Sequence, residues 1–338
     1  MRKTFLSLFS AFALLLMFNA CSTDVDLYAD YKNITVVYGL LDSGADTNFV
    51  KITKAFLGPG NALEFALNPD SCNYPGKLDA KIVEYRANAS GTHYQKTTEF
   101  PLDTITVHNK EIGTFYAPDQ KVYYTTHKIK TNSDQYKYRY ELVIDRGDTI
   151  ISSITDVVGG GMFKIGQAAI NFTSNNSYFA WYPCPYASIY EVALKFYFTE
   201  VTGQDSVQRC MTWPFGTYSE YQLNFEQDEY RLPYTPSLFF YNIATMLGAD
   251  TLNNNVERLI FEPSVELCIA AGGTELYNFI TVNGPSNSLV QSIPEYTNII
   301  GGYGVFSSRI LLKKRLKLAG STLPTLCSHQ NWHFRQAR

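Results

Sequence analysis

Apolar and polar residues alternate with a period of two along much of this chain, a pattern typical of β-strands with one buried face. The clearest alternation runs from Tyr136 to Ile144, where every second residue is aromatic or aliphatic. The polar residues 145–148 interrupt it and 149–154 resume it, so this region is predicted to form a β-hairpin. Further strands are predicted at 34–41, 49–53, 121–130, 190–198, 265–269, 303–306 and 308–312.

Two short segments show helical spacing instead. Thr235 can cap a helix that has Pro236 at its first position and ends at Gly248. A second helix is predicted at 275–282, with Thr274 as its cap.

The three consecutive glycines at 159–161 predict a join between two domains, 33–158 and 162–312. The first domain has a normal size for a β-sandwich. In the second, Trp181, a proline turn and the alternating strand 190–198 resemble the B–C corner of a fibronectin type III module, so Trp181 and Tyr190 are predicted to be buried. The predicted fold class is therefore mainly β: Ig-like or fibronectin-III-like β-sandwich domains in tandem, with one or two short helices in the second.

The first twenty residues have the features of a secretory signal. Arg2 and Lys3 precede an apolar run at 5–18, and Ala20 is a small residue directly before Cys21. This run is too short to span a bilayer core of about 30 Å comfortably. We therefore expect residues 1–20 to be removed from the mature protein.

The cysteine at the cleavage site carries a further expectation. Phe18-Asn19-Ala20-Cys21 resembles a bacterial lipobox, which implies that Cys21 becomes a lipid-bearing N-terminus. The polar, acidic residues 21–32 would then be a tether between lipid and fold. The alternative is an ordinary signal peptide with a chance cysteine.

The composition favours a folded protein without a nucleic-acid partner. Hydrophobic residues make up 45% of the chain and charged residues 17%, which is enough apolar content for a packed core. The net charge of −3 gives no electrostatic reason to expect nucleic acid. Lys313, Lys314, Arg315 and Lys317 begin a predicted basic tail, 313–338, that could touch anionic lipid, although such a run is more often a solvated edge strand.

Aromatic residues make up 15% of the chain, and 25 of them are tyrosines, which suit half-buried strands and also binding surfaces. The residues that we select as candidate partner-binding residues are Tyr136, Tyr138, Tyr140 and Tyr296.

Five cysteines follow Cys21, an odd number that allows at most two disulfides within one chain. They are Cys72, Cys184, Cys210, Cys268 and Cys327. We expect most of them to be buried free thiols, with one bridge at most. Cys327, His329 and His333 could place three metal ligands together, but a C-terminal segment does not by itself supply a fourth ligand or an ordered scaffold, so no metal is predicted.

The chain lacks the common catalytic signatures, with no GxSxG, HExxH or Walker sequence. The glycines at 271–273 and 300–304 are interpreted as turns. Glu191 and Glu266 lie on predicted strands, and the separation that a glycosidase pair requires cannot be read from sequence. We therefore predict no enzyme activity, no catalytic residue and no cofactor.

Three segments together resemble a family of Bacteroidota outer-membrane lipoproteins of unassigned function: Val36-Val37-Tyr38-Gly39-Leu40-Leu41, Val50-Lys51-Ile52-Thr53-Lys54-Ala55, and Tyr296-Thr297-Asn298-Ile299 leading into Gly301-Gly302-Tyr303-Gly304-Val305-Phe306. The resemblance implies a lipobox, an Ig-like N-terminal domain, a second β-rich domain and a closing glycine-rich segment. Members are often encoded beside TonB-dependent receptors. This implies an outer-membrane protein as partner.

We therefore predict a protein anchored in the outer membrane by its lipid, on the periplasmic face or the cell surface, that binds as an accessory subunit of an envelope receptor or assembly. One alternative is a structural subunit of an envelope complex. Another is a hydrolase of surface glycans or peptides.

Overall fold

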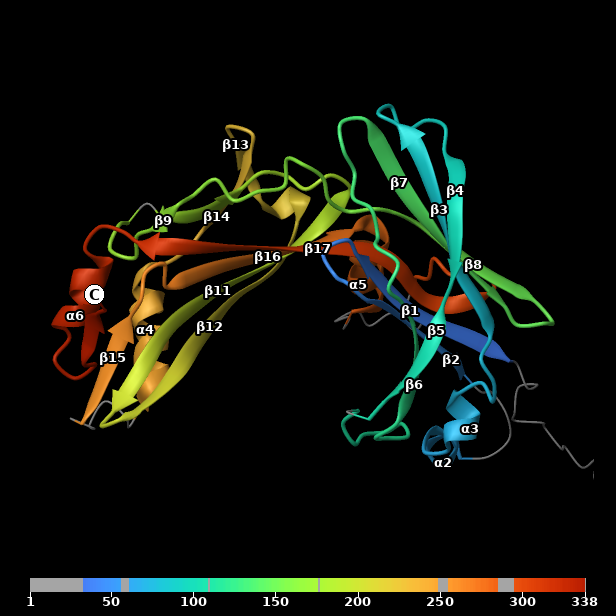
Figure 1. Cartoon of the computed structure of the whole chain (residues 1–338), viewed down its shortest axis with the longest axis horizontal. Helices are drawn as coiled ribbons and strands as arrows, with labels where there is room; N and C mark the ends of the chain where they lie inside the picture. Colours follow the sequence, from blue (N-terminus) through green and yellow to red (C-terminus); the bar gives the residue numbers. More distant parts are fainter. Residues whose placement is uncertain are drawn as a thin grey trace, which may run out of the picture.

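The computed structural model describes residues 33–55, 61–108, 110–175, 177–248, 255–284 and 295–337. Strands account for 51% of the structure and helices for 14%, so the predicted mainly β fold class is confirmed. Figure 1 shows an elongated molecule with two lobes, and long strands run from one lobe into the other. Cys21 and the predicted signal lie outside the described residues.

The first lobe is built mainly from the N-terminal half of the chain. Its strands are β1 (Ile34–Asp42), β2 (Asn48–Ala55), β3 (Asp79–Asn88), β4 (Gln95–Pro101), β5 (Asp103–Val107), β6 (Gln120–Thr125), β7 (Tyr136–Asp145) and β8 (Ile150–Asp156). Two short helices, α2 (Ala62–Ala66) and α3 (Pro69–Cys72), lie between β2 and β3. The side chains of Asn61 and Asn68 cap them by accepting hydrogen bonds from backbone N–H groups, as asparagine commonly does at this position.

Two sheets enclose the core of the first lobe. One sheet has the order β4-β3-β7-β8, and the other contains β1-β2-β6-β5 as one end of an eleven-stranded sheet. Buried residues from both sheets form one hydrophobic cluster, including Val37, Ile52, Ile82 and Leu142. The predicted period-two face of 136–144 is confirmed for Tyr140, Leu142 and Ile144, because all three are at most 1% exposed.

The second lobe contains the rest of the large sheet and a three-stranded sheet, β10-β14-β13. Its strands are β9 (Ala169–Ile170), β10 (Tyr178–Trp181), β11 (Ala187–Thr202), β12 (Asp205–Ser219), β13 (Asn224–Glu226), β14 (Glu229–Pro233), β15 (Val256–Ile260), β16 (Val265–Gly273), β17 (Gly302–Leu318) and β18 (Phe334–Gln336). Its helices are the 3-10 turn η1 (Glu220–Gln222), α4 (Ser237–Leu247), α5 (Thr274–Asn283) and α6 (Thr322–Ser328). The helices α4 and α5 lie within one residue of their predicted bounds, but their N-cap residues are Pro236 and Gly273 rather than the predicted Thr235 and Thr274.

The core of the second lobe is strongly aromatic. Phe172 stacks on Phe239 of α4 with ring centroids 3.9 Å apart, and further rings from β10, β11 and β12 surround them. Trp181 and Tyr190 are 0% and 1% exposed, so their predicted burial is confirmed.

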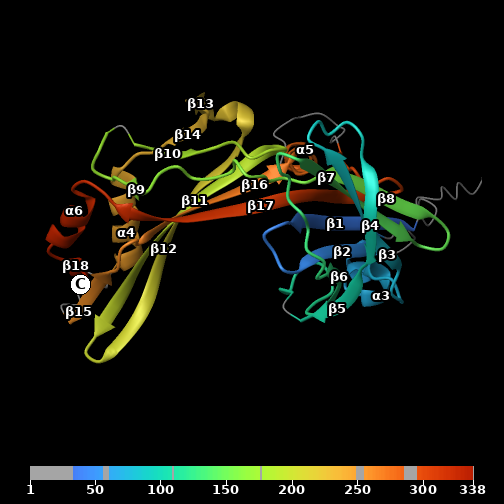
Figure 2. The ribbon, with the colours of Figure 1, turned by 45° about the horizontal axis from the view of Figure 1, so that its top comes forward.

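The long strand β17 joins the two lobes. The segments 303–306 and 308–312, predicted as separate strands, are parts of this one element. Its first half pairs in parallel with β1, and its second half pairs antiparallel with β16. Phe306 therefore belongs to the first core and Leu316 to the second. Figure 2 shows β17 running between the lobes. Residues 299–308, which fall inside the predicted second domain, thus complete the first lobe.

Glycines occur where chain segments approach most closely. Gly304 has φ +110° beside β1, and a Cβ there would overlap the backbone of Val37. Gly159, in the predicted join, has φ +119°, and a Cβ there would meet Thr131 Oγ1 at 3.0 Å. Val157 and Val158, just before this join, belong to the first and the second core respectively.

The C-terminal segment 313–338 is not a tail. Its basic residues lie within β17, where Lys313, Arg315 and Lys317 are exposed at alternate positions. The chain then forms α6 and β18, and Leu326 and Phe334 are buried in the second core. The expectation of a tail was wrong because the charged residues occupy the solvated face of a strand whose other face is packed.

Candidate functional site

The three tyrosines predicted on β7 differ in accessibility. Tyr136 is 38% exposed, and the guanidinium of Arg86 lies 4.6 Å from its ring centroid. Tyr138 is half-buried. Tyr140 is 0% exposed, and its hydroxyl donates a hydrogen bond of 2.8 Å to Glu84. The prediction that Tyr140 contacts a partner is therefore wrong, because the strand carries its ring into the core.

Tyr296 belongs to a different part of the fold. Its backbone N–H donates to Asn283 Oδ1 at 3.1 Å, and Asn283 Nδ2 donates to its carbonyl at 2.9 Å. These two hydrogen bonds hold the half-buried Tyr296 against the end of α5. The structure therefore does not place it on the strand that carries the other candidate tyrosines.

The candidate metal ligands do not form a site. The ring of His329 stacks on Trp332 with centroids 3.8 Å apart. Within the described ranges, no group of three or more His, Cys, Asp or Glu residues is placed to hold a metal ion.

The five described cysteines are all free thiols, but fewer are buried than expected. Cys184 and Cys268 are buried, Cys72 is half-buried, and Cys210 and Cys327 are exposed. The expectation that most would be buried is wrong, because Cys210 and Cys327 lie on surfaces that nothing in the described structure covers.

Glu191 and Glu266 do not have the spacing of a glycosidase pair. Glu191 lies opposite Ala270 and Glu266 lies opposite Lys195, so four residues separate the two positions along the ladder. At about 3.3 Å per residue this is roughly 13 Å, beyond the ~6.5–9.5 Å of inverting enzymes. Glu266 is also held by Arg315 at 3.3 Å and by the Tyr197 hydroxyl at 3.1 Å.

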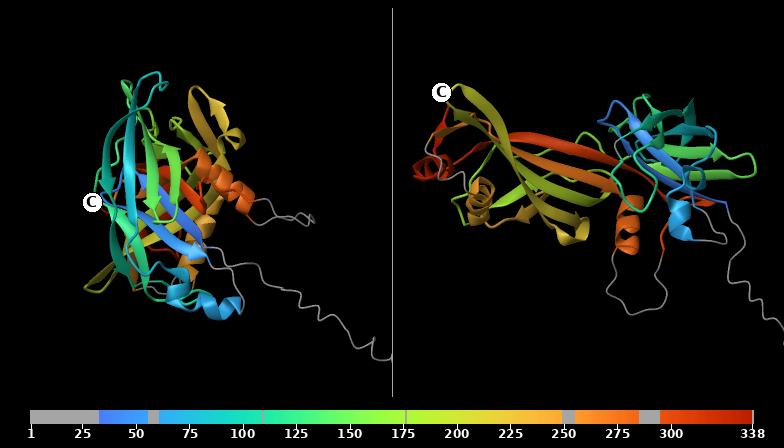
Figure 3. Two further views of the ribbon diagram at one scale, coloured as in Figure 1. Left: turned by 90° about the vertical axis from the view of Figure 1, so that its right-hand side faces the viewer. Right: turned by 90° about the horizontal axis from the view of Figure 1, so that it is seen from below.

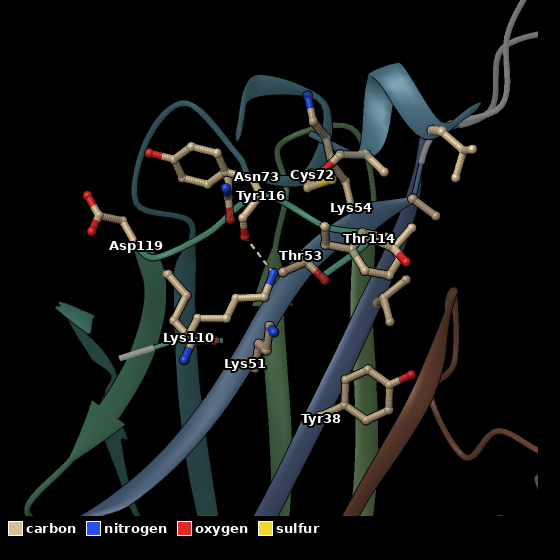
Figure 4. A pocket seen from close by; sticks show the side chains of 16 residues that line it. Tyr38, Lys51, Thr53, Lys54, Cys72, Asn73, Lys110, Thr114, Tyr116 and Asp119 are labelled. Carbon is tan, nitrogen blue, oxygen red and sulfur yellow. Dashed lines mark hydrogen bonds between the residues drawn. The ribbon is translucent and has the colours of Figure 1, made fainter. Parts of the chain in front are cut away.

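The structure instead reveals a pocket on the outer face of β1 and β2, which we call the Lys51 pocket. It has a volume of about 570 Å³, within the ~300–1,000 Å³ range of small-molecule sites. Its floor consists of Val36, Tyr38, Lys51 and Thr53, the outward residues of the two strands. Its walls come from α2–α3 and from the segment 110–120, which includes Phe115. Figure 4 shows these side chains around the pocket.

The lining of this pocket is basic, although the protein carries a net charge of −3. The lining includes Lys51, Lys54 and Lys110 but a single acidic residue, Asp119, which pairs with His108 at 2.7 Å. Among the described residues, no carboxylate forms an ion pair with any of these three lysines. Lys110 donates instead to the carbonyl of Tyr116 at 2.6 Å.

The surroundings of Lys51 in the pocket disfavour its charged form. Burial lowers the pKa of Lys51 below its ordinary value, and the positive charge of Lys110 lowers it further. Figure 4 shows the side chains of Lys51 and Lys110 directed into the same part of the pocket. A bound anion would relieve this repulsion.

Cys72 lies beside these lysines, but it is not activated. Burial raises the pKa of its thiol, although the charges of Lys110, Lys54 and Lys51 act to lower it. A neutral thiol is a poor nucleophile at neutral pH. The thiol is therefore not primed for nucleophilic attack at neutral pH.

A second pocket continues along the same face, and we call it the α5 pocket. It has a volume of about 470 Å³ and is lined by Leu276, Phe279 and Ile280 of α5 and by Phe49 of β2. Tyr38 lines both pockets, and its ring meets Phe279 edge-on at 6.0 Å. We call the two pockets together the β1–β2 groove. Figure 3 shows α5 (orange) and the α2–α3 segment (blue), which form its two ends, on the same side of the molecule.

Sequence reasoning predicted β1 and β2 but missed this groove. A signal was present: Tyr38 and Phe49 are large apolar residues on the face opposite the core residues Val37 and Val50, and they remain 46% and 50% exposed. Alternation alone does not show whether another part of the chain covers such a face. Lys110 and α5 are far from these strands in sequence, so only the fold brings them to the groove.

No protein-family model matches this chain, and no curated protein matches it. The helices in the described part of the chain are too short or too polar to cross a lipid bilayer.

Proposed function

We propose that this protein is a lipid-anchored outer-membrane protein that works by binding, without catalysis, as an accessory to an envelope receptor or assembly. The observation that carries the proposal is the β1–β2 groove, which combines exposed apolar side chains with lysines that form no ion pair with a described carboxylate. Its one thiol is not activated, and its Asp119 is paired with His108 at the surface. Such a site supports recognition of a ligand better than turnover.

The anchor is proposed from the resemblance of residues 18–21 to a lipobox. Cys21 lies twelve residues before Asn33, the first described residue, so the tether would be short. Cys21→Ser should abolish lipid attachment, because the thiol is the acylation site. Metabolic labelling with a fatty-acid probe tests this, and unchanged labelling of the variant would disprove the anchor. A Ser22→Ala variant serves as the matched control and should be labelled normally.

The partner that we propose is an outer-membrane protein of the TonB-dependent receptor type. Tyr136 and Tyr138 on β7 and the segment around Tyr296 remain the candidate contacts, and Tyr136 is the most accessible of the three. A specific, stable interface buries about 1,200–2,000 Å² in total. Crosslinking in intact cells followed by mass spectrometry should recover an outer-membrane protein.

The outcome of that experiment separates the alternatives. Recovery only of other envelope-complex subunits, with no receptor, would favour a structural subunit. Recovery of no partner, together with measurable cleavage of a glycan or peptide panel, would favour a hydrolase.

We also propose that the first lobe is an Ig-like sandwich. Its two facing sheets with one shared core support this, as does the parallel pairing of β1 with the closing strand β17. In such folds, end loops and exposed faces are the usual binding surfaces.

A further inference from the structure

We propose that the β1–β2 groove binds an amphiphile with an anionic head and a long apolar chain. The head lies at Lys51 and Lys110, and the chain passes Tyr38 toward α5. This inference rests on the proposed binding function and adds the chemical class of the ligand.

The anionic head follows from the charges in the Lys51 pocket. Lys51 and Lys110 repel each other, and no described carboxylate forms an ion pair with either of them. A carboxylate or phosphate between the two lysines would supply a negative charge. Its oxygens would accept charge-assisted hydrogen bonds from their ammonium groups. A cationic or strongly hydrated neutral ligand would leave the repulsion in place.

The elongated shape follows from the register of the floor. Val36 lies opposite Thr53 and Tyr38 lies opposite Lys51, and Leu40 continues the same outward row into the α5 pocket. From Val36 to Leu40 this row extends over roughly 13 Å at about 3.3 Å per residue. An isolated phosphate or short carboxylate would fill only one end of it.

The apolar chain follows from the side chains beyond Tyr38. Phe49 and Ile280 in the α5 pocket are 50% and 47% exposed, and Tyr38 between the two pockets is 46% exposed. Exposed apolar surface of this extent commonly marks a binding site. A chain laid along it would remove these residues from water.

A peptide strand fits the floor less well. Tyr38 belongs to a strand that is already paired on both sides, with Lys51 of β2 and with Val305 of β17. Its backbone offers no free edge for strand addition, on which extended peptides depend. Recognition at this position therefore relies on side chains, as expected for an acyl chain.

The test uses the full chain in its native membrane. Palmitate that carries a diazirine near its terminal methyl group is photocrosslinked, and the labelled peptides are mapped by mass spectrometry. We expect the label on the peptide that contains Phe279 and Ile280. Free palmitate should compete with the probe. Octanoate should need a concentration at least roughly tenfold higher for the same competition, because its shorter chain buries less apolar surface.

Variants locate the two ends of the ligand. The double variant Lys51→Gln/Lys110→Gln should reduce labelling about tenfold. A loss of affinity of this size is typical when one or two charge-assisted hydrogen bonds are removed. Lys313→Gln, an exposed lysine of the second lobe, is the matched control and should label normally. Ile280→Arg obstructs the far end without touching the lysines, and it should also reduce labelling. Unchanged melting temperatures confirm that the variants fold.

A second probe distinguishes two sources of the same chemistry. A photoreactive phosphatidylglycerol with the diazirine in its acyl chain tests a bilayer lipid, whereas the palmitate probe tests a free fatty acid. Labelling of the groove by either probe supports the inference and names the source. Labelling by neither, unchanged labelling of the lysine variants, or equal competition by octanoate would overturn it.

Failure here is separable from failure of the proposed function. If the groove is unlabelled but the protein still crosslinks to an outer-membrane partner, only the proposed ligand class is refuted. If the groove is labelled but no such partner is recovered, only the proposed accessory role is refuted.

Discussion

The large sheet has outer faces of opposite character in the two lobes. In the second lobe, Glu266 pairs with Arg315, which in turn stacks over the ring of Tyr197 at 3.8 Å. In the first lobe, Lys51 lies on the corresponding outward side without a described carboxylate partner, among exposed apolar residues. Charges that satisfy one another contribute to structure, whereas charges of one sign beside apolar surface are available for a ligand. The binding function that we propose is therefore assigned to the first lobe.

Buried charges, by comparison, are treated alike in the two lobes. Arg258 in the second lobe is 0% exposed and donates to Glu200 at 2.9 Å and to the Trp332 carbonyl at 2.9 Å. Glu84 in the first lobe has a fully buried side chain that accepts from Lys130, Thr97 and Tyr140. Buried charges in both lobes are thus paired, which sets the groove lysines apart.

The largest expected effect is at the core of the second lobe. Trp181→Ala should cost about 3–5 kcal/mol of unfolding free energy, because it removes a fully buried ring. Since β17 runs through both cores, we expect one shared unfolding transition in urea rather than two. Tyr221→Ala, at an 85% exposed ring, should change stability by no more than about 0.5 kcal/mol. An unchanged midpoint for Trp181→Ala, or separate transitions of the lobes, would contradict this picture.

Removing a paired buried charge should have the next largest effect. Arg258→Met should lower the unfolding free energy by about 3 kcal/mol. The substitution removes the donor to the Trp332 carbonyl, and it leaves Glu200 with only one of its two arginine partners, Arg209. Urea denaturation measures the loss. The exposed Arg335, which pairs with Glu257 at 2.9 Å, supplies the control. Its replacement by Met should cost at most about 1 kcal/mol, and equal losses at the two sites would refute the distinction.

Glu84 should give a smaller effect that depends on pH. Burial by itself raises the pKa of Glu84, but hydrogen bonds from Lys130, Thr97 and Tyr140 outweigh it, so the net pKa lies below the ordinary value of 4.5. Its stabilising contribution is therefore complete above the unfolded pKa and is lost as the pH falls through the folded pKa. Glu84→Gln should lower the unfolding free energy by about 1–3 kcal/mol at neutral pH. It should also weaken the fall in unfolding free energy at acid pH, which we call the acid limb.

Urea titrations at several pH values test this prediction. Glu99→Gln, which changes an exposed carboxylate on the neighbouring strand β4, is the control and should cost little. If the acid limb of Glu84→Gln had the same slope as that of the parent, the proposed linkage would be wrong.

The smallest effect on stability is expected in the groove. The lowered pKa of Lys51 means that folding disfavours its charged form, so below the folded pKa this charge costs stability. Lys51→Met should change the unfolding free energy by no more than about 0.5 kcal/mol, in the stabilising direction. Differential scanning calorimetry of Lys51→Met and Arg258→Met under the same conditions compares the two changes in stability. A loss above about 1 kcal/mol would show that Lys51 is a structural residue.

The sequence by itself predicted the local structure well, for identifiable reasons. The alternation in 136–144 and 190–198 identified buried faces, since side chains of a strand point to opposite sides. Pro236 and Gly248 bounded α4 because proline suits the first turn and glycine tolerates the conformation that ends a helix. These signals depend only on near neighbours in the chain.

Only the tertiary structure decided which faces are covered and which segments meet. Tyr136 and Tyr140 share one strand face, yet one is exposed and the other holds a buried carboxylate. The joining of both lobes by β17, and the meeting of Lys51 with Lys110 and of Tyr38 with Phe279, depend on pairing between residues far apart in the chain. Local periodicity carries no information about such pairing, because it shows which face of a strand is buried but not which strand lies beside it.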